Sequence, residues 1–351
     1  MIDIAKISYR FVCIAPDGTQ LDLTPVATDA GWEEGAKELS VRISMRLHNA
    51  RRDGKYISES VQPGTPIYIY AIIGGASQEV ARGFVEKWVP SFSNGQTVLD
   101  ITAYDEMHAL RHSQDNGFYV EGTGSRAILT SIFDKWGIPY DYQGPDVAHG
   151  KTVFQKKFLC DMVREILDDA KKKGAGVFFA RAKEGVVQIL PRGTNEEVYH
   201  FDAASNAVRA TDSYDSGGMV TRVVIVGKDG EDGKQKVEAT VDGRTEFGVR
   251  QAIIDRPKDK SLDDATKSAQ EILKEKGSIK RTPRLEAPDL PFLRKGDRIR
   301  VSVGTVTGYF FVKSVRHNAD DQKMTLEIDE DKESNGSYDT NAMDETNGED
   351  P

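Results

Sequence analysis

The stretch Leu39-Ser40-Val41-Arg42-Ile43-Ser44-Met45-Arg46-Leu47 decides the fold, because apolar and polar residues alternate through all nine of its positions. Side chains along a β-strand point to opposite faces in turn, so the apolar residues of this stretch share one face. The residues on that face are Leu39, Val41, Ile43, Met45 and Leu47. An apolar face opposite a polar one predicts a strand in an antiparallel sheet that is buried on one side only.

Short strands also surround this stretch on both sides. Apolar residues alternate or cluster over residues 7–14, 66–73, 81–89 and 97–104, with turn residues between these segments. Ser93-Asn94-Gly95-Gln96 has the composition of a hairpin turn between the last two strands. Strands at this spacing predict a small barrel or sandwich, and we place this first β domain at residues 1–112.

Residues 113–208 change to a mixed pattern. A helix is expected from Ser125 to a stop at Gly137, and a second helix is indicated by an apolar stripe within residues 158–170. Two strands, at 177–181 and 186–190, follow the second helix. This segment therefore predicts a compact α+β domain.

The β pattern returns over residues 209–330. A hairpin of strands 221–227 and 236–241 is expected, then a helix capped by Ser261 and ended by Gly277, then three strands at 298–303, 308–316 and 322–328. We expect a second β domain here, containing one helix. The fold class is thus α+β and mainly β, with two small antiparallel β-barrel domains flanking the α+β domain.

Composition narrows the classes of function. The chain has 351 residues, enough for two or three domains, and a net charge of −9. Residues 331–351 hold seven acids and one base, a net −6, so the remainder carries only −3. An acidic segment with almost no apolar residues predicts a disordered tail. A nearly balanced body gives no basic footprint for nucleic acid, so we expect no specific nucleic-acid binding.

Membrane, secretory and disulfide signals are also missing from the sequence. No apolar run approaches the ~18 residues that a membrane-spanning helix requires, so no membrane insertion is expected. The amino terminus has an early acid and no apolar signal region, which predicts synthesis and folding in the cytoplasm. Cys13 and Cys160 are far apart and are interpreted as small buried hydrophobes.

Two motifs resemble ligand sites. Gly122-Thr123-Gly124-Ser125-Arg126-Ala127 matches a dinucleotide fingerprint, but no doubly wound pattern surrounds it, so a helix N-terminus is favoured. Asp331, Glu333, Asn335, Gly336 and Asp339 mimic a calcium loop. Ala342 at its last ligand position cannot supply a carboxylate, so a solvated acidic tail is favoured.

The remaining reactive residues form no convincing constellation. His108 and His112 are spaced to chelate a metal on a helix, but no third ligand stands out, and a surface pair is favoured. No G-x-S-x-G elbow occurs, and Cys160 is expected to pack rather than react. Adjacent acids such as Asp168-Asp169, Asp263-Asp264 and Asp320-Asp321 are expected on solvated faces. We therefore assign no catalytic, cofactor-binding or metal residue, expect no cofactor, and predict a protein that is not an enzyme.

The order of several segments resembles a known family. In the first third these are Leu23–Trp32, the strand Leu39–Leu47, Val61–Ile67, Ala81–Val85 and Ile101–Asp105; in the last third they are Met219–Gly227, Glu246–Gln251 and Leu293–Val301. Over about residues 20–330 the chain resembles the baseplate hub, or tail hub, proteins of contractile phage tails and phage-like particles. That family is similar to the amino-terminal part of type VI secretion spike proteins.

The resemblance implies two tube-like β-barrel domains in each chain. Three copies would then present six similar barrels, so that a homotrimer can adapt a sixfold tail tube to a threefold spike or tip. The implied partners are the tail tube protein, the spike or tail-tip protein and other baseplate proteins of a contractile injection system. The implied location is the virion, in the tail baseplate, after assembly in the host cytoplasm.

Two other classes of function stay open at the level of the sequence. A tail-associated cell-wall hydrolase is considered because tail tips often carry such domains. It would clear peptidoglycan, and the clearing would disappear on substitution of Cys160 or His149; we expect no clearing. A carbohydrate- or receptor-binding β protein would need an exposed aromatic patch, for which Tyr140 and Tyr142 are too few.

Overall fold

The computed structural model of the chain describes residues 7–52, 54–93, 95–229, 235–257 and 260–335. The chain divides into two compact units: residues 1–210 together with 284–351, and residues 211–283. The fold is mainly β with a large, mostly antiparallel sheet, so the expected class, α+β and mainly β, is confirmed. Two separate barrels at the chain ends stay a prediction, as do the domain limits 1–112, 113–208 and 209–330.

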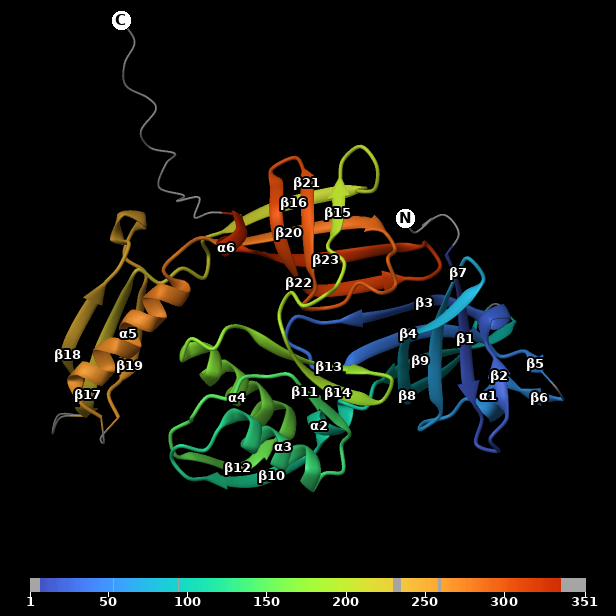
Figure 1. Cartoon of the computed structure of the whole chain (residues 1–351), viewed down its shortest axis with the longest axis horizontal. Helices are drawn as coiled ribbons and strands as arrows, with labels where there is room; N and C mark the ends of the chain where they lie inside the picture. Colours follow the sequence, from blue (N-terminus) through green and yellow to red (C-terminus); the bar gives the residue numbers. More distant parts are fainter. Residues whose placement is uncertain (1–6, 53, 94, 230–234, 258–259, 336–351) are drawn as a thin grey trace, which may run out of the picture. The chain divides into compact units, whose positions relative to one another are not determined.

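The first β region of unit 1 lies at the beginning of the chain (Figure 1). Its long strands are β1 (Ser8–Ile14), β3 (Ala27–Glu34), β4 (Val41–His48), β7 (Pro66–Ile73), β8 (Ala76–Ser93) and β9 (Gln96–Tyr104). Its short elements are β2 (Gln20–Asp22), η2 (Thr24–Val26), β5 (Arg51–Arg52), β6 (Lys55–Tyr56) and α1 (Ile57–Ser60). These strands enclose one apolar core.

Strand β4 shows how far the alternating pattern holds. Val41, Ile43, Met45 and Leu47 are buried in the first core, as predicted. Leu39 is an exception, because it lies before β4 and packs against the core of the middle region instead. Alternating residues share a face only where the chain is an extended strand. Because β4 begins at Val41, Leu39 lies outside the strand and does not share its buried face.

The middle region of unit 1 packs two helices between two small sheets. Its helices are α2 (His108–His112), α3 (Ser125–Lys135) and α4 (Leu159–Lys172). One sheet pairs β10 (Gln114–Tyr119) with β12 (Thr152–Phe158), and the other has the order β11 (Tyr140–Tyr142), β14 (Val186–Pro191), β13 (Phe178–Lys183). Helices α3 and α4 contact each other and strands of both sheets. The predicted stripe of α4 is buried, except Phe158, which precedes the helix and is exposed.

The last β region of unit 1 has its own apolar core. Its elements are β15 (Tyr199–Asp202), β16 (Arg209–Asp215), β20 (Lys280–Pro288), β21 (Arg298–Val303), β22 (Val306–Asn318), β23 (Lys323–Glu330) and α6 (Lys332–Asn335). Strands β16 and β20 also carry the chain into and out of unit 2. Of the predicted acidic tail, residues 336–351 lie outside the described residues.

Strands from both ends of the chain form one sheet of 13 strands. Its main path runs β16-β20-β23-β22-β3-β4-β9-β8-β7-β1-β2, with β15 and β21 off this path. The two β regions meet where β22 pairs antiparallel with β3, with His317 opposite Trp32 and Asn318 opposite Gly31. We call this β3–β22 pairing the seam. It fixes the last β region against the first.

Unit 2 is a small α+β unit of its own. Strands β18 (Gln235–Asp242), β17 (Arg222–Asp229) and β19 (Gln251–Asp255) form its sheet, η3 (Thr245–Phe247) precedes β19, and helix α5 (Leu262–Lys276) covers the sheet. The predicted hairpin of β17 and β18 is confirmed. The predicted cap at Ser261 is also confirmed, and Asp264 completes a capping box with it at the start of α5. This unit has a separate apolar core.

Candidate functional site

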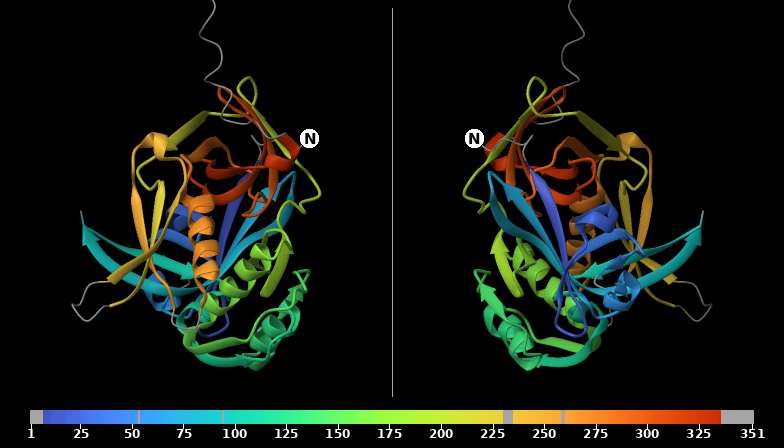
Figure 2. Two further views of the ribbon diagram at one scale, coloured as in Figure 1. Left: turned by 90° about the vertical axis from the view of Figure 1, so that its left-hand side faces the viewer. Right: turned by 90° about the vertical axis from the view of Figure 1, so that its right-hand side faces the viewer.

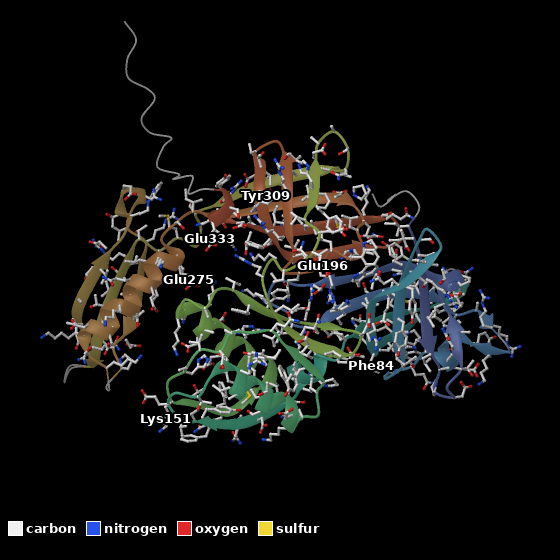
Figure 3. The ribbon with its side chains drawn as sticks, in the orientation of Figure 1. Phe84, Lys151, Glu196, Glu275, Tyr309 and Glu333 are labelled. Atoms are coloured by element: carbon white, nitrogen blue, oxygen red, sulfur yellow. The ribbon has the colours of Figure 1, made fainter. Side chains whose placement is uncertain are left out.

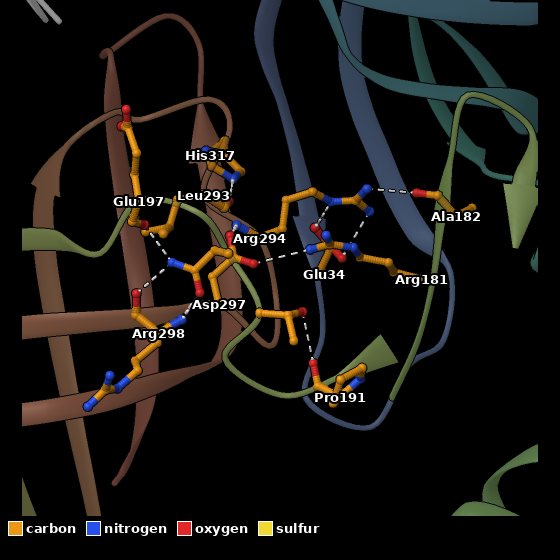
Figure 4. A network of polar contacts seen from close by, with 12 residues as sticks. Glu34, Arg181, Ala182, Pro191, Glu197, Leu293, Arg294, Asp297, Arg298 and His317 are labelled. Carbon is orange, nitrogen blue, oxygen red and sulfur yellow. Dashed lines mark hydrogen bonds and ion pairs between the residues drawn. The ribbon is translucent and has the colours of Figure 1, made fainter. Parts of the chain in front are cut away.

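A network of charged side chains ties together three parts of unit 1, and we call it the clamp (Figure 4). It centres on the turn Arg294–Asp297, which precedes β21. The guanidinium of Arg294 donates from Nε to Glu34 Oε1 (2.7 Å) and from Nη2 to Glu34 Oε2 (3.1 Å), a two-pronged ion pair to the end of β3. Its Nη1 donates to the carbonyl of Ala182 in β13 (2.7 Å).

The next three residues of the turn extend the clamp. Lys295 donates to the carbonyls of Gly35 and Glu38, just after β3. Gly296 has a φ of +92°, and a Cβ there would lie 2.1 Å from the ring of Phe179. Asp297 accepts from the backbone amide of Arg294 (2.9 Å) and from Arg181 Nη1 (3.2 Å). The turn Arg294–Asp297 belongs to the stretch Leu293–Val301 that carried the family resemblance. Its three charged side chains are all hydrogen-bonded to other parts of the fold, and its glycine packs against Phe179.

The electrostatics of the clamp follow from burial and pairing. Burial alone would raise the pKa of Glu34, but the adjacent Arg294 and Lys295 hold that pKa below its ordinary value. Burial opposes the charge on Arg294, yet Glu34 outweighs it and raises the pKa of the guanidinium. Burial lowers the pKa of Lys295 and outweighs the opposing effect of the Glu34 carboxylate. The Glu34–Arg294 pair therefore stays ionised at neutral pH.

A second buried polar chain crosses the seam. The Tyr9 hydroxyl donates to Asp289 Oδ2 (2.5 Å), whose other oxygen lies 2.5 Å from His317 Nδ1. His317 Nε2 lies 3.1 Å from the carbonyl of Leu293, and the imidazole stacks on Trp32 with ring centroids 4.5 Å apart. Burial next to Asp289 strongly raises the pKa of Tyr9, so its hydroxyl remains a donor.

A hollow of about 460 Å³ borders the clamp. Glu196, labelled in Figure 3, lines it together with residues of β8, of β13 and of the turn before β21. Among the described residues, the buried atoms Arg181 Nε and Glu106 Oε2 have no hydrogen-bond partner. Arg294, Asp297 and Asp105 of its lining are hydrogen-bonded within the fold, so this side of the hollow holds three segments together.

A Ser–His–Asp arrangement lies in the middle region, and the sequence reasoning missed it. Ser125 Oγ is 2.6 Å from His149 Nε2, and His149 Nδ1 is 2.6 Å from Asp169 Oδ2. These are the distances of a catalytic triad. Ser125, however, is fully buried at the start of α3 and bonds to the carbonyl of Val147. A hollow beside the set includes His149 and Asp169 in its lining but not Ser125.

The hydrolase residues named from the sequence do not come together. Cys160 is half-buried against the core of the middle region, and burial raises the pKa of its thiol, which disfavours the nucleophilic thiolate. His149 is engaged by Ser125 and Asp169. Tyr142 is buried and donates to the carbonyl of Pro145, so Tyr140 and Tyr142 form no exposed aromatic patch.

The glycine motif at 122–127 opens α3, but the amides near it are already used. Gly122, Thr123 and Ser125 donate to the carbonyls of His149, Val120 and Val147. The preceding strand β10 pairs only with β12, antiparallel, and not within a parallel sheet. The structure thus supports a helix N-terminus over a pyrophosphate cradle.

The calcium-like segment is only partly described. Asp331 is buried and binds Arg298 (3.0 Å), so this carboxylate is engaged in the fold. Gly336, Asp339 and Ala342 lie outside the described residues.

His108 and His112 gain a third neighbour in space. Both lie on α2, as the spacing indicated, and Glu86 of β8 lies beside them, with the three ligand atoms all within 4.8 Å of one another. Nothing in the sequence pointed to Glu86, because a bulge in β8 and the turn after β9 decide where it lies.

Comparison with known proteins places the chain in a family. The YQBQ-like family matches residues 33–329. The chain belongs to this YQBQ-like family. It is a phage tail-type family, and solved structures with the same fold are phage tail, baseplate and type VI secretion spike-related proteins, as the sequence resemblance predicted. No curated relative matches the sequence of this chain.

Solved structures extend the likeness over nearly the whole YQBQ-like chain, at low identity. A tail protein from Neisseria meningitidis is similar with a TM-score of 0.65 and 13% identity, over 93% of this chain and 97% of that one. A 43 kDa prophage tail protein from Shewanella oneidensis is similar with a TM-score of 0.66 and 13% identity, over 92% and 98%. A type VI secretion component from E. coli is similar with a TM-score of 0.51 and 11% identity, over 92% and 73%.

No helix among the described residues of the YQBQ-like chain is long and apolar enough to cross a membrane.

Proposed function

We propose that this YQBQ-like protein is a structural baseplate hub of a contractile phage tail or phage-like particle, and that it acts by assembly rather than catalysis. In this proposal three copies form a ring that adapts a sixfold tail tube to a threefold spike or tip. The partners are the tube protein, the spike or tip protein and surrounding baseplate proteins. The protein belongs to the virion and assembles in the host cytoplasm.

The observation that carries the proposal is the seam. Strands from both ends of the chain belong to one sheet through the β3–β22 pairing, and the clamp adds the Glu34–Arg294 ion pair between the same regions. Each chain thus holds two sheet-rich regions in a fixed relation within unit 1. Three such chains would supply six sheet-rich regions. A ring of three chains could then match a sixfold neighbour on one side and a threefold neighbour on the other.

Exposed apolar side chains on β8 support contacts between copies. Phe92 is 74% exposed and Phe84 is 46% exposed, and Val89 is also exposed. Strands β8 and β9 reach beyond the other strands of the first β region (Figure 2). Covering large apolar side chains that are exposed to water lowers the free energy of the assembly. A second copy that covers β8 therefore fits this position.

The test is the mass of the purified full-length protein in solution. Light scattering after size exclusion is expected to give three times the chain mass, or a complex once tube or spike protein is added. Phe92→Ser is expected to weaken the trimer, whereas the matched variant Phe118→Ser, at another exposed phenylalanine, is expected to leave it intact. A chain that stays monomeric and binds neither tube nor spike protein refutes the proposal.

A further inference from the structure

Three side chains from two elements converge beside the first β region. Nε2 of His108 contacts Oε2 of Glu86, and Nε2 of His112 lies 3.9 Å from the same oxygen. The three ligand atoms all lie within 4.8 Å of one another, and among the described residues no other group of three such side chains gathers in this way. Two imidazoles and one carboxylate thus converge from β8 and α2.

Local backbone features bring these residues together. Between β8 and β9, Val85 pairs with Ala103 and Lys87 with Thr102, so Glu86 is the extra residue of a β-bulge. A bulge turns its side chain away from the regular alternation of the strand. Residues four apart on a helix share a face, which aligns His108 with His112 on α2. Phe84, labelled in Figure 3, marks the adjoining part of β8.

The surroundings of His108 favour ligation. Its ring stacks on Tyr104 with centroids 4.2 Å apart, and it meets His112 edge-on at 4.3 Å. Both ring nitrogens of His108 are buried, and neither makes a hydrogen bond in the described part of the chain, although Nε2 contacts Glu86. A metal ion between Nε2 and the Glu86 carboxylate would ligate both atoms.

We propose that Glu86, His108 and His112 form a Zn²⁺ site. Two imidazoles and a carboxylate are a ligand set that zinc accepts in tetrahedral coordination, with a fourth position for water or a partner's side chain. The ion would link α2 to β8, and so join the first β region to the middle region. The role we propose is structural, because the ion would bridge two elements of the fold.

The experiment uses the full-length protein and zinc chloride in a buffer that does not chelate metals. Calorimetry is expected to show one site per chain near neutral pH, and Co²⁺ used in its place is expected to give the visible absorption of a four-coordinate ion. His112→Ala and Glu86→Gln change exposed side chains, so both variants should fold. Each is expected to weaken zinc binding at least about tenfold, because one of three protein ligands is lost.

A matched control separates this site from adventitious binding. His48→Ala removes a histidine on β4 of the same β region and is expected to leave zinc binding unchanged. Zinc is also expected to raise the melting temperature of the wild type and the control, but not of His112→Ala. No binding by the wild type, or binding by both ligand variants as tight as that of the wild type, overturns the proposal. In that event the cluster is a His–Glu ion pair.

Discussion

Glu34 and Arg294 lie 260 residues apart in the chain and form a two-pronged ion pair, with nitrogen–oxygen distances of 2.7 and 3.1 Å. Both side chains are almost wholly removed from solvent, with 5% and 15% of their surfaces exposed. The pair joins the end of β3 to the turn before β21, close to the seam. It is a buried polar link between the first and last β regions.

Removing one member of this pair leaves the other charge buried without a partner. We expect Arg294→Met to lower the free energy of unfolding by about 3–5 kcal/mol, the usual cost of a broken buried ion pair. Urea denaturation followed by tryptophan fluorescence measures it. Glu34→Leu combined with Arg294→Met should regain much of the loss, because the double variant removes both charges of the pair. Arg46→Met, which breaks an exposed pair with Asp100, should change little.

The depressed pKa of Glu34 makes the fold sensitive to acid. The folded protein holds this carboxyl ionised at a pH where the unfolded chain has already taken up a proton. The stabilisation is therefore present above the ordinary glutamate pKa of about 4.3 and is lost as the pH falls through the lower pKa of the folded state. Urea midpoints measured from neutral to acid pH should fall more steeply for the wild type than for the Glu34→Leu/Arg294→Met variant. Equal slopes would contradict this assignment.

Asp105 has the opposite dependence on pH. Burial raises its pKa to about 8, outweighing the two backbone amides, of Val41 and Met107, that donate to it. The folded state then holds a proton that the unfolded chain releases, so the stability falls as the pH rises from about 4 to about 8. Asp105→Asn keeps an acceptor oxygen without the charge. It should flatten this slope, as unfolding at several pH values will show.

Gly31 is required at the seam. A Cβ at this position would lie 2.3 Å from the carbonyl oxygen of His317, closer than any real contact. We expect Gly31→Ala to separate β3 from β22 locally and to destabilise the protein by a few kcal/mol, roughly 1–3. Gly150→Ala is the matched control, because a Cβ there meets nothing within 4 Å. Hydrogen exchange of the β22 amides gives a direct measurement, and unchanged protection in Gly31→Ala would count against the role of the seam.

The Ser125–His149–Asp169 set is expected to hold structure rather than to hydrolyse. Ser125 is fully buried, so a fluorophosphonate probe for active serines should not label the native protein. His149→Ala should cost about 1–3 kcal/mol, because it removes the buried imidazole that contacts both Ser125 and Asp169. Clearing of peptidoglycan by the wild type that disappears in Ser125→Ala would show instead that the site is catalytic.

The sequence by itself determined the features that depend on neighbours in the chain. The alternation in Val41–Leu47 fixed a buried face, the stripe on α4 fixed a helix that covers a core, and Ser261 with Asp264 fixed the start of α5. Each of these is set by a period or a cap within a few residues. The order of such elements was enough for the family resemblance.

Only the tertiary structure decided which distant segments meet. The pairing of β3 with β22, the contact of Glu34 with Arg294 and the convergence of Glu86 on His108 join residues that no local period relates. The compact unit of residues 211–283 is likewise defined by where the chain leaves and re-enters unit 1. Such contacts form only when long loops close and distant segments pack into a shared core. A single strand with a glycine turn could pair with many other strands, and only the complete sheet decides which one.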